Sequence, residues 1–317
     1  MNTNDKIGVC SRSFSRNPLL RSELLSKFSN VKFNDEGLSL NGDTLVEFLS
    51  DCDGAVIALE YINNDILDRL PKLKFIGKYG VGLDKLDFDA LDKHQVKLGW
   101  TPGVNATSVA ELTLNMALTI VRNTTESNQR AEKMQWKQVT GKQLSSLTFG
   151  IVGFGHVGSK VGRLAKAFGC DVKVFDKVDK SAECAEVGVD FVGFNELLQQ
   201  ADIISVHVPG NAETHHMLGA AQFAQMKTGS YLINSARGGI VDEAALLAAL
   251  NSDKMAAAGV DVLEIEPPTD LDFIAHPKTF VTTHIGGSSE EAIVAMGFAA
   301  IEGLSNYTVA SEFEIYK

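Results

Sequence analysis

The chain has 317 residues, enough for about two domains, and its 44% hydrophobic and 22% charged residues are typical of a folded globular protein rather than a disordered one. Acidic residues outnumber Lys and Arg by 40 to 29, a formal net charge of −11, so no basic surplus exists to bind nucleic acid. The polar start, Met1–Lys6, and the lack of any apolar run of about 18 residues exclude a membrane span and predict a cytoplasmic protein.

The cysteines and histidines do not predict a metal site. The four cysteines lie in or near apolar segments without CxxC or other metal-like spacing, and they are interpreted as reduced structural thiols: Cys10, Cys52, Cys170 and Cys184. His215-His216 is interpreted as a solvated pair in a loop, and no HExxH motif is present.

Short apolar runs alternate with amphipathic stretches along the whole chain, which predicts an α/β fold with mostly parallel sheets. The first hundred residues form one such unit. Strands are expected at 7–10, 31–33, 55–59 and 73–76, helices at 19–28, 44–49 and 65–70, and a glycine turn at 80–82.

The segment after Pro102-Gly103 links this unit to a second one. Ser108-Val109-Ala110-Glu111 fits a capping box and predicts a helix that runs to about Val121. The polar stretch 122–143, with Trp136 in it, predicts an exposed arm or a subunit contact.

A second, longer α/β unit is expected from residue 147 to residue 283. Its strands are predicted at 147–152, 172–175, 202–208, 230–234, 259–262 and 280–283, with helices that include 157–168 and 243–250.

A glycine-rich turn joins the first strand of this second unit to its helix. Gly153, Gly155 and Gly158 form GxGxxG, in which the glycines allow a tight turn, a close approach of a pyrophosphate and close packing of helix on strand. Asp176 ends the next strand, 18 residues past the last glycine, where it can accept hydrogen bonds from both ribose hydroxyls. The pattern predicts NAD binding, with a glycine turn without a ligand as the alternative. Asp176 would repel a 2′-phosphate and so favours NAD over NADP, although Lys177 beside it weakens this preference.

Charged residues directly follow three predicted strands of the second unit. Ligands of open parallel sheets bind beyond the carboxyl ends of the strands, so Arg237, Glu264 or Glu266, and His284 are candidates to converge there. Arginine can hold a carboxylate, histidine can exchange a proton, and a glutamate can orient the imidazole. Together they suit a 2-oxo acid, although each alone is also compatible with a surface ion pair or a hydrogen-bonded histidine.

Six ordered motifs give the chain a resemblance to a known family. They are Lys78-Tyr79-Gly80-Val81-Gly82-Leu83-Asp84, Pro102-Gly103-Val104-Asn105 with Ser108-Val109-Ala110-Glu111, the glycine fingerprint, Asn234-Ser235-Ala236-Arg237-Gly238-Gly239, Asp261 with Glu266-Pro267, and His284-Ile285-Gly286-Gly287-Ser288. With these motifs the sequence resembles the D-isomer-specific 2-hydroxyacid dehydrogenases, in the branch similar to D-3-phosphoglycerate dehydrogenase.

The resemblance implies two doubly wound parallel-sheet domains with a cleft between them. They are a flavodoxin-like substrate-binding domain of residues 1–100 and 287–317 and a Rossmann NAD-binding domain of residues 101–286, through which family members usually form homodimers. The catalytic residues would be Arg237, Glu266, which directly precedes the proline, and His284. Substrate would meet Lys78, Tyr79, Val81, Gly82 and Arg237, the backbone N–H groups of Val81 and Gly82 holding its carboxylate. NAD would lie against Gly153, Gly155, His156, Val157, Gly158, Asp176, Ser235, Ala236, Asp261, His284 and Gly286.

The implied reaction is a reversible hydride transfer between NAD(H) and C2 of a 2-hydroxy or 2-oxo acid, with His284 as acid and base. Phosphoglycerate enzymes of the family present an arginine after the third strand, where this chain has Glu60. Glu60 would repel a phosphate unless Arg12, Arg16 or Lys78 from a neighbouring loop binds it instead. Two other functions stay open: an NADH-sensing corepressor or scaffold on the same fold, and a hydride-transfer enzyme that acts on a non-carboxylate.

Overall fold

The computed structural model describes residues 4–316, which divide into two compact units. One unit combines the chain up to Asn105 with the part from Gly287 onwards, and the other is Ala106–Gly286. The first boundary lies beyond the expected residue 100 because Val104 still packs against the core of the first unit.

The first unit is built on a five-stranded parallel sheet in the order β2-β1-β3-β4-β5, which is the flavodoxin-like order. Residue Ile7 of β1 lies opposite Val31 of β2 on one side and Gly54 of β3 on the other, so the strand order reverses at β1. The strands are β1 (Lys6–Val9), β2 (Asn30–Phe33), β3 (Gly54–Ile57), β4 (Phe75–Lys78) and β5 (Lys97–Gly99).

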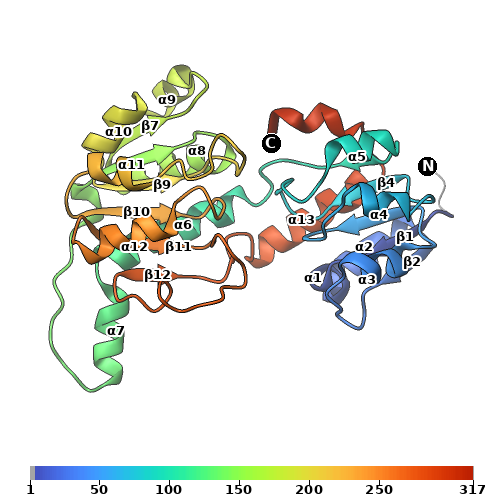
Figure 1. The fold of residues 1–317 in the computed structure, drawn as a ribbon, viewed down its shortest axis with the longest axis horizontal. Helices are drawn as coiled ribbons and strands as arrows, with labels where there is room; N and C mark the ends of the chain where they lie inside the picture. The colour runs from blue at the N-terminus through green and yellow to red at the C-terminus, as the bar shows by residue number, and fades with distance from the viewer. Residues whose placement is uncertain (1–3, 317) are drawn as a thin grey trace. The chain divides into compact units, whose positions relative to one another are not determined.

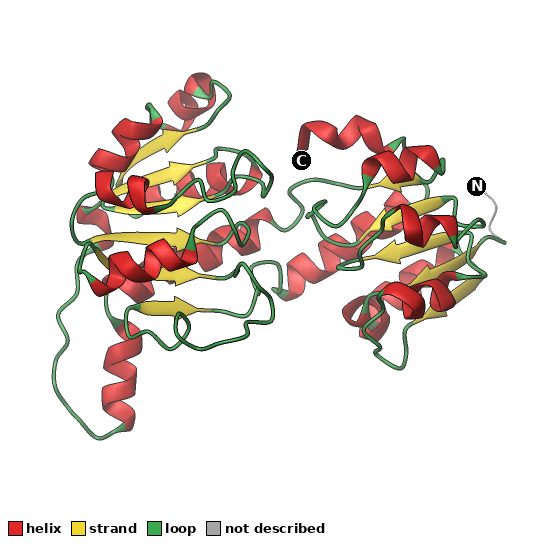
Figure 2. Ribbon diagram, in the orientation of Figure 1, coloured by secondary structure: helices red, strands yellow, loops and turns green. Residues whose placement is uncertain are grey.

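Helices cover both faces of this sheet (Figure 2). One face packs against α1 (Arg12–Arg16), α2 (Pro18–Lys27) and α13 (Glu290–Gly303), and the other against α3 (Gly42–Leu49), α4 (Asn64–Asp68) and α5 (Phe88–Lys93), with the short helix η2 (Ala310–Tyr316) beside α5. Helix α13 approaches the sheet so closely that a Cβ on Gly99 would lie 2.0 Å from the carbonyl oxygen of Gly303. Glycine at this position therefore allows a segment from the end of the chain to complete the core of the first unit.

The second unit is built on a seven-stranded parallel sheet in the order β12-β11-β10-β9-β6-β7-β8 (Figure 1). Strand β6 pairs with β7 on one side and with β9 on the other, so the point where the strand order reverses lies between β6 and β9. The strands are β6 (Thr148–Val152), β7 (Asp171–Phe175), β8 (Asp190–Phe191), β9 (Ile203–Val206), β10 (Ser230–Asn234), β11 (Met255–Val260) and β12 (Thr279–Val281).

Helices also cover both faces of the seven-stranded sheet. Helices α6 (Ala106–Val121) and α8 (His156–Ala167) contribute to one core with the short helix η1 (Leu144–Ser146), and α10 (Phe194–Gln200), α11 (Ala220–Gln225) and α12 (Glu243–Asn251) contribute to the other; α9 (Ser181–Val187) follows β7. This is the doubly wound Rossmann arrangement expected from the sequence.

Several local predictions need correction. The strand expected at 259–262 spans Met255–Val260, and β5 and α5 of the first unit were not predicted. Helix α6 begins at Ala106, so Ser108 lies inside the helix and does not cap it; its hydroxyl instead donates a hydrogen bond to the carbonyl oxygen of Gly286 at 2.6 Å. The stretch 122–143 is exposed as predicted, but it contains the helix α7 (Thr124–Glu132), which has no buried residue and stands off the body of its unit (Figure 1).

Within residues 4–316, no helix has the combination of length and hydropathy that crossing a bilayer requires.

Candidate active site

The turn between β6 and α8 forms a cradle of backbone atoms. Gly153 has a φ of +95°, and a Cβ on Gly158 would lie 1.9 Å from the carbonyl oxygen of Gly153, so both positions require glycine. Helix α8 begins at His156, and its N-cap residue, Gly155, provides no side-chain hydrogen bond to the first turn. The free first-turn N–H groups and the positive end of the helix dipole therefore lie at this end of α8. The space at Gly155 is open, because a Cβ there would meet nothing within 4 Å.

Asp176 lies at the end of β7, beside this cradle. Its Oδ2 accepts a hydrogen bond from the N–H of Phe154 at 2.7 Å, and its Oδ1 accepts one from the N–H of Val178 at 2.9 Å. The carboxylate is therefore fixed next to the glycine turn and keeps lone pairs for further donors, such as ribose hydroxyls. The cradle and the carboxylate together fit the pyrophosphate and ribose of NAD.

The loop after β9 packs on the other side of the glycine turn. A Cβ on Gly153 would lie 2.8 Å from the backbone of His207, and the N–H of His207 donates to the carbonyl oxygen of Val152 at 2.7 Å. The His207 imidazole is 2.8 Å from the hydroxyl of Ser205, and burial lowers its pKa to about 3. His207 is therefore neutral at physiological pH.

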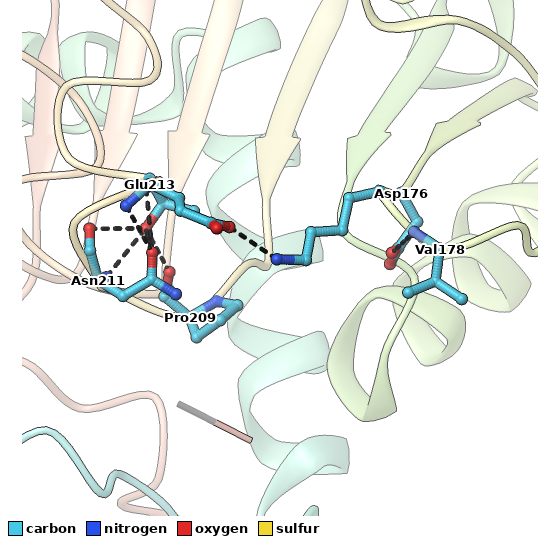
Figure 3. A network of polar contacts seen from close by, with 7 residues as sticks. Asp176, Val178, Pro209, Asn211 and Glu213 are labelled. Atoms are coloured by element: carbon cyan, nitrogen blue, oxygen red, sulfur yellow. Dashed lines mark hydrogen bonds and ion pairs between the residues drawn. The ribbon is translucent and has the colours of Figure 1, made fainter. Parts of the chain in front are cut away.

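The same loop reaches across to the residue after Asp176. Lys177 Nζ lies 2.6 Å from Glu213 Oε2, and Figure 3 shows Glu213 and Asp176 on opposite sides of this network. The ion pair was not predicted, because its partners are 36 residues apart in sequence.

Arg237 lies in the loop that follows β10. The Asn234 side chain closes this loop: its Nδ2 donates to the carbonyl oxygen of Arg237 at 2.9 Å, and its Oδ1 accepts from the N–H of Ala236 at 3.1 Å. Arg237 Nη1 donates to the carbonyl oxygen of Ala236 at 2.7 Å. Ser235 is buried, with its hydroxyl 2.8 Å from that of Thr113 on α6.

The loops after β10 and β11 are in direct contact. A Cβ on Gly238 would lie 1.9 Å from the carbonyl oxygen of Leu263, so only glycine fits there without movement of one loop. The contact brings the backbone beside Arg237 against the segment that ends at Glu266.

Glu266 and His284 form the central pair of the candidate site. Glu266 Oε2 lies 2.8 Å from His284 Nδ1, and Glu266 Oε1 accepts a hydrogen bond from the N–H of Leu263 at 2.9 Å. The two side chains are 36% and 45% exposed, so the imidazole is still open to solvent or to a ligand. Glu266, rather than Glu264, is therefore the carboxylate next to His284.

The pair shifts the pKa of both of its members. The hydrogen bond that the imidazole donates to Glu266 raises the pKa of His284, against burial and the nearby positive charge of Arg237. Burial of Glu266 favours its neutral form, but the hydrogen bonds from His284 and the N–H of Leu263 outweigh burial and lower its pKa. Arg237 also lowers the pKa of Glu266, so its charge acts on both members of the pair.

Asp261 holds the turn that carries His284. This carboxylate is 2% exposed, and it accepts hydrogen bonds from the Thr282 hydroxyl at 2.6 Å, the N–H of Ile285 at 2.8 Å and the N–H of Gly286 at 2.7 Å. The backbone carbonyl of Asp261 also accepts from the N–H of His284 at 2.9 Å. These bonds stabilise a His284 φ of +56°, which is unfavourable for a residue with a side chain.

Glu264 takes part in a different network. Its Oε1 lies 3.1 Å from His216 Nε2 and also accepts a hydrogen bond from the N–H of Glu243 at 3.1 Å. The imidazole rings of His215 and His216 stack with their centroids 4.0 Å apart. The histidine pair is therefore not only solvated, as expected from the sequence, but also tied to the loop after β11.

The four expected substrate contacts outside this unit lie at the end of β4 of the first unit, where Lys78 is the last residue of the strand and Tyr79, Val81 and Gly82 follow it. Lys78 is buried and donates to the carbonyl oxygen of Ala58 at 2.7 Å, whereas the Tyr79 ring packs edge-on against Phe14. Val81 and Gly82 are half-buried and belong to the glycine turn that starts at Gly80, whose φ is +108°.

Glu60 follows β3, and its side chain contacts the backbone of Ala58. Its Oε2 accepts a hydrogen bond from the N–H of Ala58 at 2.5 Å, and Lys78 binds the carbonyl oxygen of the same residue. The peptide groups on either side of Ala58 are thus held by one negative and one positive side chain.

Sequence reasoning missed several residues of the candidate site. Thr282 and Ser205 each bind a titratable side chain, and Gly210 packs against Arg237, where a Cβ would lie 3.0 Å from that of the arginine. Thr282 could have been predicted from the sequence, because it stands at a strand end, just before His284. The others depend on contacts between loops, which no local pattern encodes.

The comparisons of this chain with known proteins agree on one family. A family model described as "D-isomer specific 2-hydroxyacid dehydrogenase, NAD binding domain" matches residues 114–286. Among curated proteins, a hydroxypyruvate reductase of Thermotoga maritima is 34% identical over 269 residues, which are 83% of this chain and 87% of that protein. A D-3-phosphoglycerate dehydrogenase of Bacillus subtilis is 40% identical over 233 residues, which are 73% of this chain and 44% of that protein.

Solved structures agree with the sequence matches. The crystal structure of an Aquifex aeolicus D-lactate dehydrogenase complexed with NAD and lactic acid superposes with a TM-score of 0.85 at 25% identity, covering 96% of this chain and 99% of that one. The chain spans about half the length of the phosphoglycerate dehydrogenases that it matches. The chain therefore belongs to the D-isomer specific 2-hydroxyacid dehydrogenase family, and residues 114–286 match the family's NAD-binding domain.

Proposed function

We propose that the protein is an NAD-dependent dehydrogenase that interconverts a D-2-hydroxy acid and the corresponding 2-oxo acid. The observation that carries this proposal is the 2.8 Å contact between His284 and Glu266, in loops that follow neighbouring strands of an NAD-binding domain. Arg237, whose positive charge acts on both residues, supplies the group that a carboxylate substrate requires.

Each of the three residues has a distinct role. Arg237 binds the carboxylate and the carbonyl oxygen of the substrate. His284, open at the ring nitrogen that Glu266 does not hold, gives a proton to the carbonyl oxygen in reduction and takes it from the hydroxyl in oxidation. Glu266 fixes the imidazole orientation and favours its protonated form, while Asp261 holds the turn in place.

The cofactor fits the glycine cradle and Asp176 described above, and when bound it supplies or accepts the hydride at C2 of the substrate. The first-turn N–H groups of α8 would hold its pyrophosphate, and Asp176 its ribose. In the first unit, the N–H groups of Val81 and Gly82 would bind the substrate carboxylate, with Lys78 and Tyr79 supporting that turn.

The substrate is proposed to be a small 2-oxo acid of the kind used by the phosphoglycerate, hydroxypyruvate and glyoxylate enzymes among the relatives. Glu60 disfavours a phosphate on the substrate, because two negative charges would meet at that loop. Hydroxypyruvate and glyoxylate are therefore expected to be better substrates than 3-phosphohydroxypyruvate.

Assay of purified protein with NADH and a panel of 2-oxo acids tests this function directly. Turnover of at least one acid, and its loss in a His284→Asn variant that still binds NADH, supports the proposal. Tight NADH binding without turnover of any acid would contradict it and favour a cofactor sensor.

We also propose that the protein forms a homodimer through the NAD-binding domain and works in the reducing cytoplasm. The exposed arm 122–143 supports the dimer, because it presents apolar side chains that no described residue covers. All four cysteines are buried and unpaired, which supports a reducing compartment.

A further inference from the structure

Six charged side chains gather around the end of β7, next to the proposed ribose position. They are the carboxylates of Asp176, Asp179, Glu183 and Glu213 and the ammonium groups of Lys177 and Lys180. Lysines that follow this strand are the groups on the chain best placed to receive a phosphate on the 2′-oxygen of the ribose, the feature that distinguishes NADP from NAD.

Each of these two lysines is engaged by a glutamate. Lys177 Nζ lies 2.6 Å from Glu213, and Lys180 Nζ lies 2.9 Å from Glu183 on the first turn of α9. The partner of Lys180 is local, only three residues away, whereas the partner of Lys177 comes from the loop after β9. Glu213 is thus the only one of the two glutamates that another part of the fold brings to the site.

Glu213 is held in a tightly hydrogen-bonded loop. Asn211 Oδ1 accepts hydrogen bonds from the N–H groups of Glu213 and Thr214 at 3.0 and 3.1 Å, and the Thr214 hydroxyl donates to the carbonyl oxygen of Pro209 at 2.6 Å (Figure 3). The loop also packs on the glycine turn, since a Cβ on Gly153 would lie 2.9 Å from Val208. The loop therefore fixes the Glu213 backbone relative to the nucleotide cradle.

We propose that Glu213 is a specificity-determining residue that favours NAD over NADP by pairing with Lys177 across the cradle. The inference rests on the proposed nucleotide site and adds a second residue to Asp176, whose role the sequence already predicts. Asp176 would repel a 2′-phosphate directly, whereas Glu213 acts by pairing with Lys177, a cation next to Asp176 in the chain that would attract one.

The expected size of the effect follows from exposure. Lys177 and Glu213 are 74% and 72% exposed, and ion pairs at such positions contribute little and are weakened by salt. Removal of the Glu213 charge is therefore expected to tighten NADPH binding only about two- to fivefold, while NADH binding changes by less than about twofold.

Equilibrium titration of NADH and NADPH by calorimetry at low salt tests the inference without any turnover. Glu213→Gln removes the charge and keeps the shape of the side chain. Glu186→Gln is the matched control, because Glu186 is an exposed glutamate on α9 that makes no contact with Lys177. Lys177→Gln, alone and combined with Glu213→Gln, completes a double-mutant cycle.

The expected result is a lower ratio of the NADPH to the NADH dissociation constant in Glu213→Gln, no change in Glu186→Gln, and no effect of Glu213→Gln once Lys177 is replaced. An unchanged ratio in Glu213→Gln, or an equal change in the Lys177→Gln background, would overturn the inference and leave the proposed function intact. Failure of the wild-type protein to bind either dinucleotide would overturn both.

Discussion

At the scale of single residues, the hydrogen bond between His284 and Glu266 links proton transfer to pH. Because Glu266 raises the pKa of His284, the imidazole stays protonated to a higher pH than a free histidine would. Reduction of the 2-oxo acid needs the protonated form, so its rate is expected to fall as pH rises through this pKa. Oxidation needs the neutral form and is expected to rise over the same range.

Replacement of Glu266 tests this link. Glu266→Gln removes the negative charge, so the pKa of His284 falls and the decline of the reductive kcat is expected to begin at lower pH. The pH profiles of kcat for the wild type and the variant measure the shift. Glu264→Gln is the control, because Glu264 lies in the same loop but contacts His216 and Glu243. Superimposable profiles of Glu266→Gln and the wild type would remove Glu266 from this role.

Replacement of His284 is expected to lower kcat more than replacement of Glu266 does. His284→Asn removes the proton donor, and general acid catalysis typically contributes about 10²- to 10⁴-fold, so kcat is expected to fall by that factor. Steady-state kinetics measure the loss, and NADH titration checks that the cofactor still binds. A variant that retains wild-type kcat would exclude His284 as the acid and base.

His207 makes folding stability depend on pH. Burial lowers its pKa from 6.5 to about 3 in the folded protein, whereas the unfolded chain binds a proton below about pH 6.5. Unfolding therefore takes up a proton between these values, and the free energy of unfolding decreases as pH falls, by at most about 1.4 kcal/mol per pH unit.

Urea denaturation at several values between pH 7.5 and pH 5 measures this effect. His207→Gln keeps a polar group near Ser205 but cannot titrate, so its free energy of unfolding is expected to vary less with pH than that of the wild type. Carboxylates titrate in both proteins, so the difference between the two curves isolates His207. Parallel curves would show that His207 is not held neutral.

At the scale of elements, the close contact of the loops after β10 and β11 makes Gly238 a sensitive position. A Cβ there would lie 1.9 Å from the Leu263 carbonyl oxygen, so Gly238→Ala must displace one loop and with it Arg237 or Glu266. We expect kcat/KM to fall by about 10²-fold, because small misplacements of catalytic groups have effects of that size. Kinetics and near-ultraviolet circular dichroism separate this loss from unfolding.

Gly193→Ala is the matched control for this substitution. Gly193 is the N-cap of α10, has a φ of −69° and open space where its Cβ would lie, so the change is expected to leave kcat/KM close to wild type. A Gly238→Ala variant as active as Gly193→Ala would show that the loops move without consequence.

Long apolar runs were predictable from the sequence, whereas exposed elements and short ones were not, including α5 and β5, which contribute to a core but have only six and three residues. The run at 230–234 matches β10 because all five of its residues are buried. Helix α7 buries no residue, so no periodic pattern marks it, and α1 is too short to show one. The start of α6 was misplaced because Ser108 fits a capping box but binds Gly286 instead.

The candidate site was predictable up to the contacts between loops. Strand ends made Arg237 and His284 candidates, but the residues alone did not decide between Glu264 and Glu266. That choice depends on the N–H of Leu263, which holds Glu266, and on the N–H of Glu243, which holds Glu264. Both bonds depend on how the chain folds in the loop after β11, and no local pattern encodes them.

At the scale of the whole molecule, the arm 122–143 is the proposed contact between the two subunits of the dimer. Trp136 is 94% exposed and Met134 is 89% exposed, an arrangement that favours a protein contact over contact with water. Replacement of both by serine is expected to weaken the proposed dimer at least tenfold and to leave the fold intact, since neither side chain contributes to a core. Sedimentation velocity over a range of concentrations measures the change.

Two outcomes would contradict the role of the arm. A monomeric wild-type protein at all concentrations would exclude the dimer itself. A variant that sediments as the wild type does would place the dimer contact elsewhere on the protein.

The fit of α13 against the first sheet has a consequence for synthesis. Met296, Ala300 and Ile301 of this helix complete a core whose other members, such as Ile7 and Phe75, are translated long before it. The unit 106–286 is continuous and precedes α13 in the chain, so it is translated before α13. Until α13 is translated, the part of the sheet face that it covers beside α1 and α2 stays exposed, so folding of the first unit is expected to finish only after the second unit has been synthesised.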